Sequence, residues 1–203
     1  MIDEATWWSI GGGLIYGAEV TSEIYTVDNG WQLFAPFGEP GIRSGSRCNL
    51  QLNQTHYFMT GGFAQARDFL MVDISDEKLA KVTRLPETPV TTDYAPCAFL
   101  YNDDGSREII ISGIGMGAGG HTLIFSFETQ TWRDGPSLPT PSGYAEGMQY
   151  GETILVAGGS YSKGQVHIYD IKNSGWTTLS QNLTFEGHMD AAFLVPDDAL
   201  NCV

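Results

Sequence analysis

The sequence predicts an all-β protein built from four similar units. Its 203 residues include 25 glycines and are 42% hydrophobic but only 17% charged, a composition typical of a globular, turn-rich chain. An apolar stretch that runs into glycine recurs four times, and an aromatic residue followed by a tryptophan recurs three times at a similar distance behind it. A chain of this length suffices for one repeat array, so we expect a single domain over residues 1–203.

Strands that end in glycine set the repeat period. The four stretches read TWWSIGGG, HYFMTGG, EIIISGIG and ETILVAGG, and their first aligned glycines are 49, 52 and 45 residues apart. A period near 50 residues indicates a repeat architecture. Glycine suits a strand end pressed against a neighbour, because it accepts a positive φ and lets two backbones approach closely. The glycines expected to have this structural role are Gly12, Gly13, Gly61, Gly62, Gly113, Gly158 and Gly159.

An aromatic pair follows the glycine loop in three of the units. The pairs, six or seven residues apart, are Tyr25 and Trp31, Phe125 and Trp132, and Tyr169 and Trp176. This spacing places the two rings on the two strands of a hairpin. We expect all three tryptophans to be buried between neighbouring units. In the second unit Leu79 stands where the tryptophan would be, which predicts lighter packing there.

Each unit is completed by a proline-containing loop and one more strand, which makes four strands. A four-stranded sheet with apolar residues on both faces must stack on neighbours, and the radial solution is a β-propeller. The predicted blades cover about residues 6–40 together with 188–197, then 43–86, 92–139 and 142–182.

The segment EPGIRSGSRCNLQLNQTHYFMTGG resembles the kelch family nearly position for position. It shows that family's Pro-Arg-Ser-Gly, apolar strand, turn, second strand and Gly-Gly. The resemblance extends over essentially the whole chain, with the largest departure at Ile114, which replaces the second glycine of its unit. It implies a kelch-type β-propeller of four four-stranded blades. A kelch pattern is specific for fold and not for function.

Two arrangements of the ring stay open. The chain starts on a second-strand sequence and ends on MDAAFLVPDD, which is similar to a first strand. If residues 188–197 pair beside the first strand, both chain ends complete one terminal blade, as is common in kelch propellers. The alternative is an open ring that forms the C-terminal part of a longer protein, since kelch rings more often have six blades.

The charge balance argues against nucleic-acid and membrane partners. Ten Lys and Arg against 24 Asp and Glu give a formal net charge of -14, which repels phosphate backbones and anionic headgroups. No apolar run approaches the roughly 18 residues that span a bilayer, and the first residues lack the order of a signal peptide. We therefore expect a soluble chain.

The cysteines and sequons point to different compartments. Cys48, Cys97 and Cys202 are an odd number at wide spacing, which favours a reducing, cytoplasmic location. Cys48 and Cys97 occupy the same position in successive innermost strands, where we expect buried thiols too far apart for a disulfide. Sequons at Asn53 and Asn182 are candidate N-glycosylation sites. With Cys202 available to pair upstream, they support the extracellular alternative, which requires a leader upstream of this chain.

The kelch resemblance implies a binding site at the mouth of the propeller. Loops that enter the innermost strands converge there, and the equivalent positions are Arg43, Thr92, Ser142 and Glu186. Arg43, followed by Ser44, matches the arginine with which family members hold acidic peptides, and its fork suits carboxylates; the alternative is an ordinary solvated loop arginine. Loops after the glycine strands would add Arg67, His121, Tyr161 and Lys163. We expect a protein or peptide partner and no cofactor.

No catalytic constellation is legible in the sequence. The histidines, which fall at different repeat positions without metal-ligand spacing, are His56, His121, His167 and His188. We therefore predict a non-catalytic binding or adaptor module with no metal site. The alternative is a secreted carbohydrate-active or galactose-oxidase-like propeller enzyme, which rests on analogy of fold, the sequons and Cys202.

Overall fold

The computed structural model describes most of the chain between residues 6 and 184. The described ranges are 6–10, 22–34, 47–61, 67–76, 80–92, 94–102, 104–114, 120–150, 153–159 and 161–184. Every regular element in these ranges is a β-strand, so the all-β prediction is confirmed. Within the same ranges no helix is long and apolar enough to cross a membrane.

The strands form four antiparallel sheets that follow the order of the chain. Sheet 1 contains β1 (Thr6–Ile10), β2 (Ser22–Thr26) and β3 (Gly30–Phe34), and sheet 2 contains β4 (Arg47–Gln51), β5 (His56–Gly61), β6 (Phe69–Asp73) and β7 (Lys81–Arg84). Sheet 3 contains β8 (Cys97–Tyr101), β9 (Arg107–Ile114), β10 (His121–Ser126) and β11 (Thr131–Asp134). Sheet 4 contains β12 (Glu146–Tyr150), β13 (Thr153–Ala157), β14 (Val166–Asp170) and β15 (Gly175–Thr178). Residues 188–197, which were expected to complete the terminal blade, lie outside the described residues.

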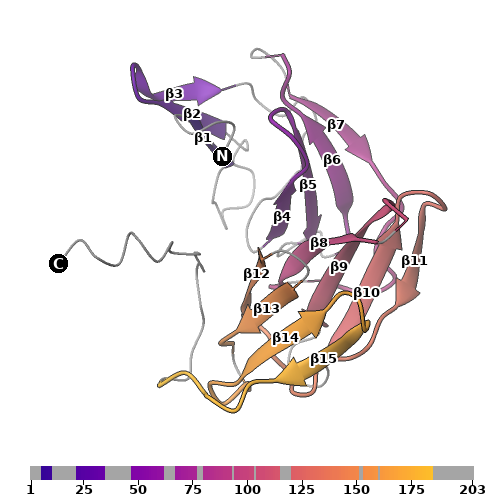
Figure 1. Cartoon of the computed structure of the whole chain (residues 1–203). Coiled ribbons are helices and arrows are strands. Elements are labelled where there is room, and N and C mark those ends of the chain that lie inside the picture. The colour runs from indigo at the N-terminus through magenta and orange to yellow at the C-terminus, as the bar shows by residue number, and fades with distance from the viewer. Residues whose placement is uncertain are drawn as a thin grey trace.

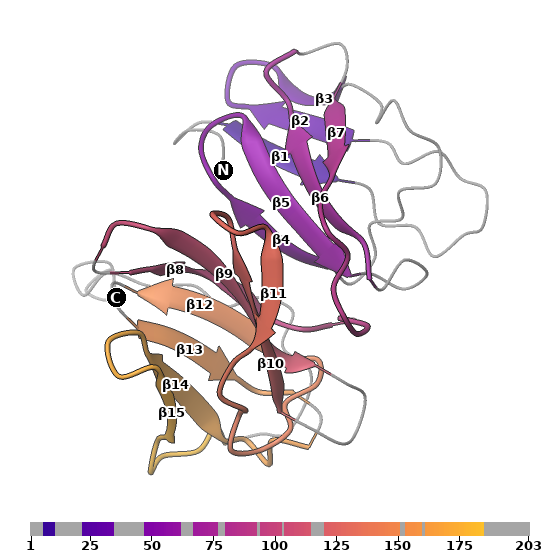
Figure 2. The ribbon, with the colours of Figure 1, turned by 90° about the vertical axis from the view of Figure 1, so that its right-hand side faces the viewer.

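The sheets follow one another around an arc (Figures 1 and 2). In Figure 1 the first strands β4, β8 and β12 lie toward the inner side of the arc, and the last strands β7, β11 and β15 lie toward its outer side. Strand β8 contacts both β4 and β12, so the inner strands of sheets 2, 3 and 4 are direct neighbours.

The core consists of apolar layers between consecutive sheets. Because successive residues of a strand face opposite sides, each central sheet supplies one layer on each face. On one face of sheet 3, Phe99, Ile109, Ile111, Leu123 and Phe125 pack against Phe58 and Phe69 of sheet 2. On its other face, Ala98, Leu100, Ile110 and Ile124 pack against Ile154 and Tyr169 of sheet 4. Between sheets 1 and 2, Ile24 packs against the cluster around Tyr57, Met59, Leu70 and Val72.

Two tryptophans join neighbouring sheets as predicted, although each stays half-buried at the outer edge. The ring of Trp132 in sheet 3 lies 5.1 Å from that of Phe69 in sheet 2, and its indole N–H donates to the carbonyl of Pro86 at 2.9 Å. Trp176 in sheet 4 donates in the same way to the carbonyl of Pro136 in the loop after sheet 3, at 2.8 Å. Each tryptophan thus contacts the sheet that precedes its own.

The prediction that Trp31 is buried is wrong. Its ring lies 5.3 Å from Tyr25 on the adjacent strand, yet the residue is 57% exposed. Trp31 has the same place in sheet 1 as Trp132 and Trp176 have in theirs. Its ring therefore lies on the face of sheet 1 that corresponds to the face with which sheets 3 and 4 contact the sheet before them. No described residue takes the place there that Pro86 takes beside Trp132.

The assignment of Leu79 to the tryptophan position also needs correction. In the strand register Val72 pairs with Val82, as Phe125 pairs with Trp132 and Tyr169 with Trp176. Val82 therefore occupies the tryptophan position, and Leu79 lies outside the described residues. The reason is a longer connection between β6 and β7, which moves the partner residue farther along the chain.

The predicted glycine conformation is confirmed wherever the structure describes it. Positive φ angles occur at Gly61 (75°), Gly113 (72°), Gly158 (72°) and Gly159 (90°). A Cβ atom on Gly61 would lie 2.5 Å from the carbonyl oxygen of Thr92, which shows the close backbone approach. The remaining three structural glycines, Gly12, Gly13 and Gly62, lie outside the described residues.

Candidate functional site

The strand register and the contacts between inner strands bring one end of sheets 2, 3 and 4 to the same side of the molecule. Gly61 at the end of β5 pairs with Arg47 at the start of β4, and Ile111 near the end of β9 pairs with Cys97 at the start of β8. A Cβ on Gly147 of β12 would lie 2.7 Å from Pro96, so the starts of β8 and β12 also meet. We call this side, marked by Gly61, Gly113 and Gly158, the glycine end.

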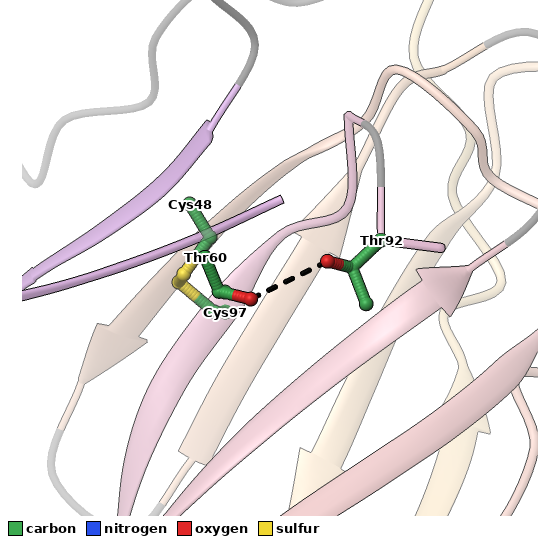
Figure 3. Close-up of a disulfide and its surroundings, with 4 residues drawn as sticks. All are labelled: Cys48, Thr60, Thr92 and Cys97. Carbon is green, nitrogen blue, oxygen red and sulfur yellow. Dashed lines mark hydrogen bonds between the residues drawn. A yellow bond between two sulfur atoms is a disulfide. The ribbon is translucent and has the colours of Figure 1, made fainter. Parts of the chain in front are cut away.

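A disulfide links two sheets at the glycine end. Cys48 on β4 is bonded to Cys97 on β8, with the two Cα atoms 5.8 Å apart (Figure 3). The expectation that these cysteines are too far apart is therefore wrong. The expectation that they occupy the same position of successive strands is also wrong. Cys48 pairs with Thr60, one residue before Gly61, whereas Cys97 pairs with Ile111, two residues before Gly113. Because successive residues of a strand face opposite sides, this offset of one residue turns Cys48 toward sheet 3 and Cys97 toward sheet 2, so the two side chains meet. Cys202 lies outside the described residues.

Thr92 and Ser142, expected to contact a partner, are packing residues in this structure. Thr92 is 0% exposed and Ser142 is 1% exposed. The Thr92 hydroxyl lies 3.4 Å from the Thr60 hydroxyl of sheet 2 (Figure 3), and the Ser142 carbonyl would lie 3.2 Å from a Cβ on Gly113. Each residue fills the space that a strand-ending glycine leaves in the preceding sheet, so neither side chain is available to a ligand.

Arg67 presents a partly exposed guanidinium at the glycine end. Its Nε donates to the carbonyl of Thr88 at 2.7 Å, and its Nη2 lies 3.5 Å from the Glu87 carboxylate. The Thr88 amide donates in return to the Arg67 carbonyl at 3.0 Å. These bonds orient Arg67 along the segment that follows β7.

His121 is paired with an exposed carboxylate on the same sheet. It begins β10, and its Nε2 lies 2.9 Å from Oδ1 of Asp134, the last residue of β11. Both side chains are open to solvent at the outer part of the glycine end. This pair can offer a partner both a hydrogen-bond donor and a negative charge.

Tyr161 and Lys163 are presented by a short, well-supported loop. Tyr161 is 60% exposed, and both residues have positive φ, at 91° and 51°. Buried Ser162 lies between them, and its hydroxyl donates to the Gly159 carbonyl at 3.1 Å and accepts from the Gly164 amide at 3.2 Å. Positive φ is uncommon for side chains of this size and is concentrated at functional sites.

A tyrosine pair that was not predicted from the sequence lies in the same region. Tyr94 and Tyr144 have ring centroids 4.1 Å apart, and both have positive φ, at 54° and 63°. They come two residues after Thr92 and Ser142, so they occupy equal positions in neighbouring units. The repeated pattern in TDYAP and SGYAE is the sequence signal that could have found them.

The other predicted positions lie either outside the described residues or elsewhere on the surface. Arg43, Ser44 and Glu186 lie outside the described residues, as does His188. Asn53 and Asn182 are both exposed.

The remaining two described histidines lie away from the exposed part of the glycine end. His56 lies 3.7 Å from the Asp73 carboxylate. His167 is buried with Nδ1 3.0 Å from the Thr178 hydroxyl, and burial lowers its pKa. His167 is therefore a neutral core residue.

The described glycine end combines aromatic rings with charges of both signs, and its groups are held by the loops that carry them. Among the described residues, no three His, Cys, Asp or Glu side chains are grouped closely enough to hold a metal ion. A scan against protein-family models and a search of the curated proteins found no match to this chain.

Proposed function

We propose that the chain is a kelch-type β-propeller module that binds a protein or peptide partner through loops at its glycine end. Four antiparallel meanders in chain order, stacked face to face along an arc, support the radial architecture. The tryptophans that bridge from one sheet to the preceding one support a repeated unit.

The observation that carries the binding proposal is the set of tyrosines with positive φ at this end. The tilted rings of Tyr94 and Tyr144 contact each other across two neighbouring units, and Tyr161 is exposed on the loop before β14. An unfavourable backbone costs about 1–3 kcal/mol per residue and persists where the surrounding structure holds it. Tyrosine offers a large contact area and a hydroxyl at small entropic cost, which suits a binding surface.

The charged groups of the glycine end fit recognition rather than catalysis. Arg67, His121 and Lys163 would give the partner donors, and Glu87 and Asp134 would give it acceptors. A surface with both kinds of charge recognises a peptide through several weak polar contacts around aromatic residues that contribute most of the binding energy. We propose no catalytic residue and no cofactor.

A secreted galactose-oxidase-like enzyme is the second candidate. The Cys48–Cys97 disulfide favours the oxidising compartment of that class. The disulfide supports a secreted protein, but it gives no support to an enzymatic activity.

Selection of peptides from a random displayed library on the full chain tests the binding proposal. We expect selected peptides to lose about tenfold or more in affinity, roughly 1.4 kcal/mol, with Tyr161→Ala or Lys163→Ala. Tyr161→Phe keeps the ring and should keep most of the affinity.

The matched control is Tyr101→Ala, which removes an exposed tyrosine at the end of β8, away from the glycine end. Selected peptides should bind this variant as they bind the parent chain. Peptides that bind all three alanine variants equally well, or that respond only to Tyr101→Ala, would contradict the proposed face.

A further inference from the structure

We propose that this chain folds in an oxidising secretory compartment and carries N-linked glycans on Asn53 and Asn182. The proposal goes beyond the binding function and does not depend on it. It rests on three separate features: the disulfide that joins the sheets of β4 and β8, the turn that holds the first sequon, and the exposed segment that holds the second.

The disulfide indicates the compartment. Cys48 is buried and Cys97 is half-buried, and the bond joins two different sheets across 49 residues of sequence. Structural disulfides persist in secreted proteins and are rare where glutathione and thioredoxin keep thiols reduced. Forming the bond removes two protons and two electrons from the thiols, and a disulfide-donating oxidoreductase of the compartment accepts the electrons.

The first sequon, Asn53-Gln54-Thr55, forms the exposed turn between β4 and β5. Asn53 Oδ1 accepts from the amides of Thr55 and His56, both at 2.9 Å, and from the Thr55 hydroxyl at 3.3 Å. Two backbone donors identify this atom as the amide oxygen, which leaves the amide nitrogen outside this hydrogen-bond network. The nitrogen is the atom to which an N-glycan is attached.

The second sequon, Asn182-Leu183-Thr184, follows β15 at the surface. Asn182 and Thr184 are exposed, whereas Leu183 is half-buried and its amide donates to the Gly164 carbonyl at 2.7 Å. The middle residue therefore fixes the segment to the molecule, and the acceptor and its hydroxyl partner face solvent. The second sequon has the exposure that an acceptor needs.

The attachment is chemically complete with one co-reactant, an oligosaccharide carried on a lipid pyrophosphate. The asparagine amide nitrogen forms a bond to the anomeric carbon of that sugar and loses a proton, while the bond from this carbon to the pyrophosphate oxygen breaks. This transfer takes place in the same compartment as disulfide formation, so both modifications assign the chain to the same oxidising secretory compartment.

The two glycans would stand at different ends of the sheets. Gln51 pairs with Tyr57 at the end of β4, so Asn53 lies at the side opposite to the glycine end. Asn182 lies beside the loop that carries Tyr161, because the backbone amide of Leu183 donates a hydrogen bond to the carbonyl of Gly164. The glycan on Asn53 would leave the candidate binding face open, and the one on Asn182 would border it.

Secretion of the full chain with an appended leader from a eukaryotic host tests the proposal. Intact mass should fall by two glycans on treatment with a glycan-releasing amidase, which also converts each occupied asparagine to aspartate. Asn53→Gln and Asn182→Gln should each remove one glycan. Thr55→Ser and Thr184→Ser preserve the sequons and should retain both glycans, whereas Thr55→Ala and Thr184→Ala should each lose one.

Alkylation of the same secreted protein without reductant provides the second readout. Cys48 and Cys97 should be protected and should appear as one linked peptide pair after proteolysis. A folded secreted chain in which neither asparagine carries a glycan would overturn the modification sites. A folded chain in which both thiols are alkylated would overturn the assigned compartment.

Discussion

At the scale of single residues, a tryptophan at the same position of the repeat is half-buried in two sheets and exposed in another. Trp132 and Trp176 each donate an indole hydrogen bond to a proline carbonyl that precedes their own sheet, at 2.9 and 2.8 Å. Trp31 occupies the equivalent place in sheet 1 and is more than half exposed. The energetic value of this position therefore depends on the neighbouring sheet and not on the tryptophan alone.

Alanine substitution of the three tryptophans should separate these cases. Removing a fully buried large ring costs about 3–5 kcal/mol, so we expect about 2–4 kcal/mol for half-buried Trp132 or Trp176. Trp31→Ala should cost less than about 1 kcal/mol, because an exposed ring leaves no cavity. Urea unfolding of the three variants measures the differences. A cost at Trp31 equal to that at Trp132 would show that sheet 1 has a partner in solution.

Burial of His167 should make the stability of the chain depend on pH. Burial lowers the pKa of His167 below the usual value of a histidine, so this group stays neutral in the folded chain while the unfolded chain takes up a proton. The unfolded state then binds more protons, and stability should fall as the pH drops below about 6.5 toward the folded pKa.

The repeat supplies the control for this measurement. Leu123 pairs with Ile111 in sheet 3 as His167 pairs with Val156 in sheet 4, so His167→Leu places a side chain that the repeat already tolerates. Urea midpoints of the parent chain should fall more steeply between pH 7.5 and 5.5 than those of His167→Leu. Equal slopes in the two proteins would show that His167 does not contribute to the pH dependence.

At the scale of elements, the inner strands are where neighbouring sheets come closest. Strand β8 contacts β4 and β12, and the Cys48–Cys97 bond ties the first of these contacts. Gly61 and Gly113 let the segments around Thr92 and Ser142 approach within van der Waals distance of the preceding sheet. The inner side of the arc is thus held by backbone packing and one covalent bond, and the outer side by the tryptophans.

Reduction of the disulfide should lower the free energy of unfolding by about 2–4 kcal/mol. The bond closes a loop of about 50 residues, and it acts mainly by restricting the unfolded chain. Urea unfolding with and without reductant measures the effect. The double variant Cys48→Ala and Cys97→Ala should resemble the reduced protein and should not respond to reductant. Identical midpoints for the oxidised and reduced parent chain would contradict a stabilising bond.

At the scale of the whole molecule, stability is distributed between neighbouring sheets. Each described sheet contacts the next in the chain, and sheet 3 is covered on both faces. In such an array stability is approximately the sum of each unit and its interfaces, so sheets with one covered face contribute less. The outer surface of sheet 1 exposes Val27, Trp31 and Leu33, which identifies it as the least covered part of the described array.

The sequence by itself determined the all-β class, the positions where strands end in glycine, and the sequence positions of the aromatic pairs. These features depend on a few consecutive residues, because positive φ, strand alternation and hairpin turns are local properties. The exception is Val82, since the length of one connection decided the register of β7.

Only the tertiary structure decided which side chains meet across sheets. Cys48 and Cys97, or Tyr94 and Tyr144, come from units about 50 residues apart, and their distances depend on how closely the sheets pack. The same packing buried Thr92 and Ser142 and left Trp31 exposed. The repeat period relates the sequence positions of such residues. It contains no information about the exact register of each strand or about the spacing of the sheets, which is set by the volume of the side chains between them.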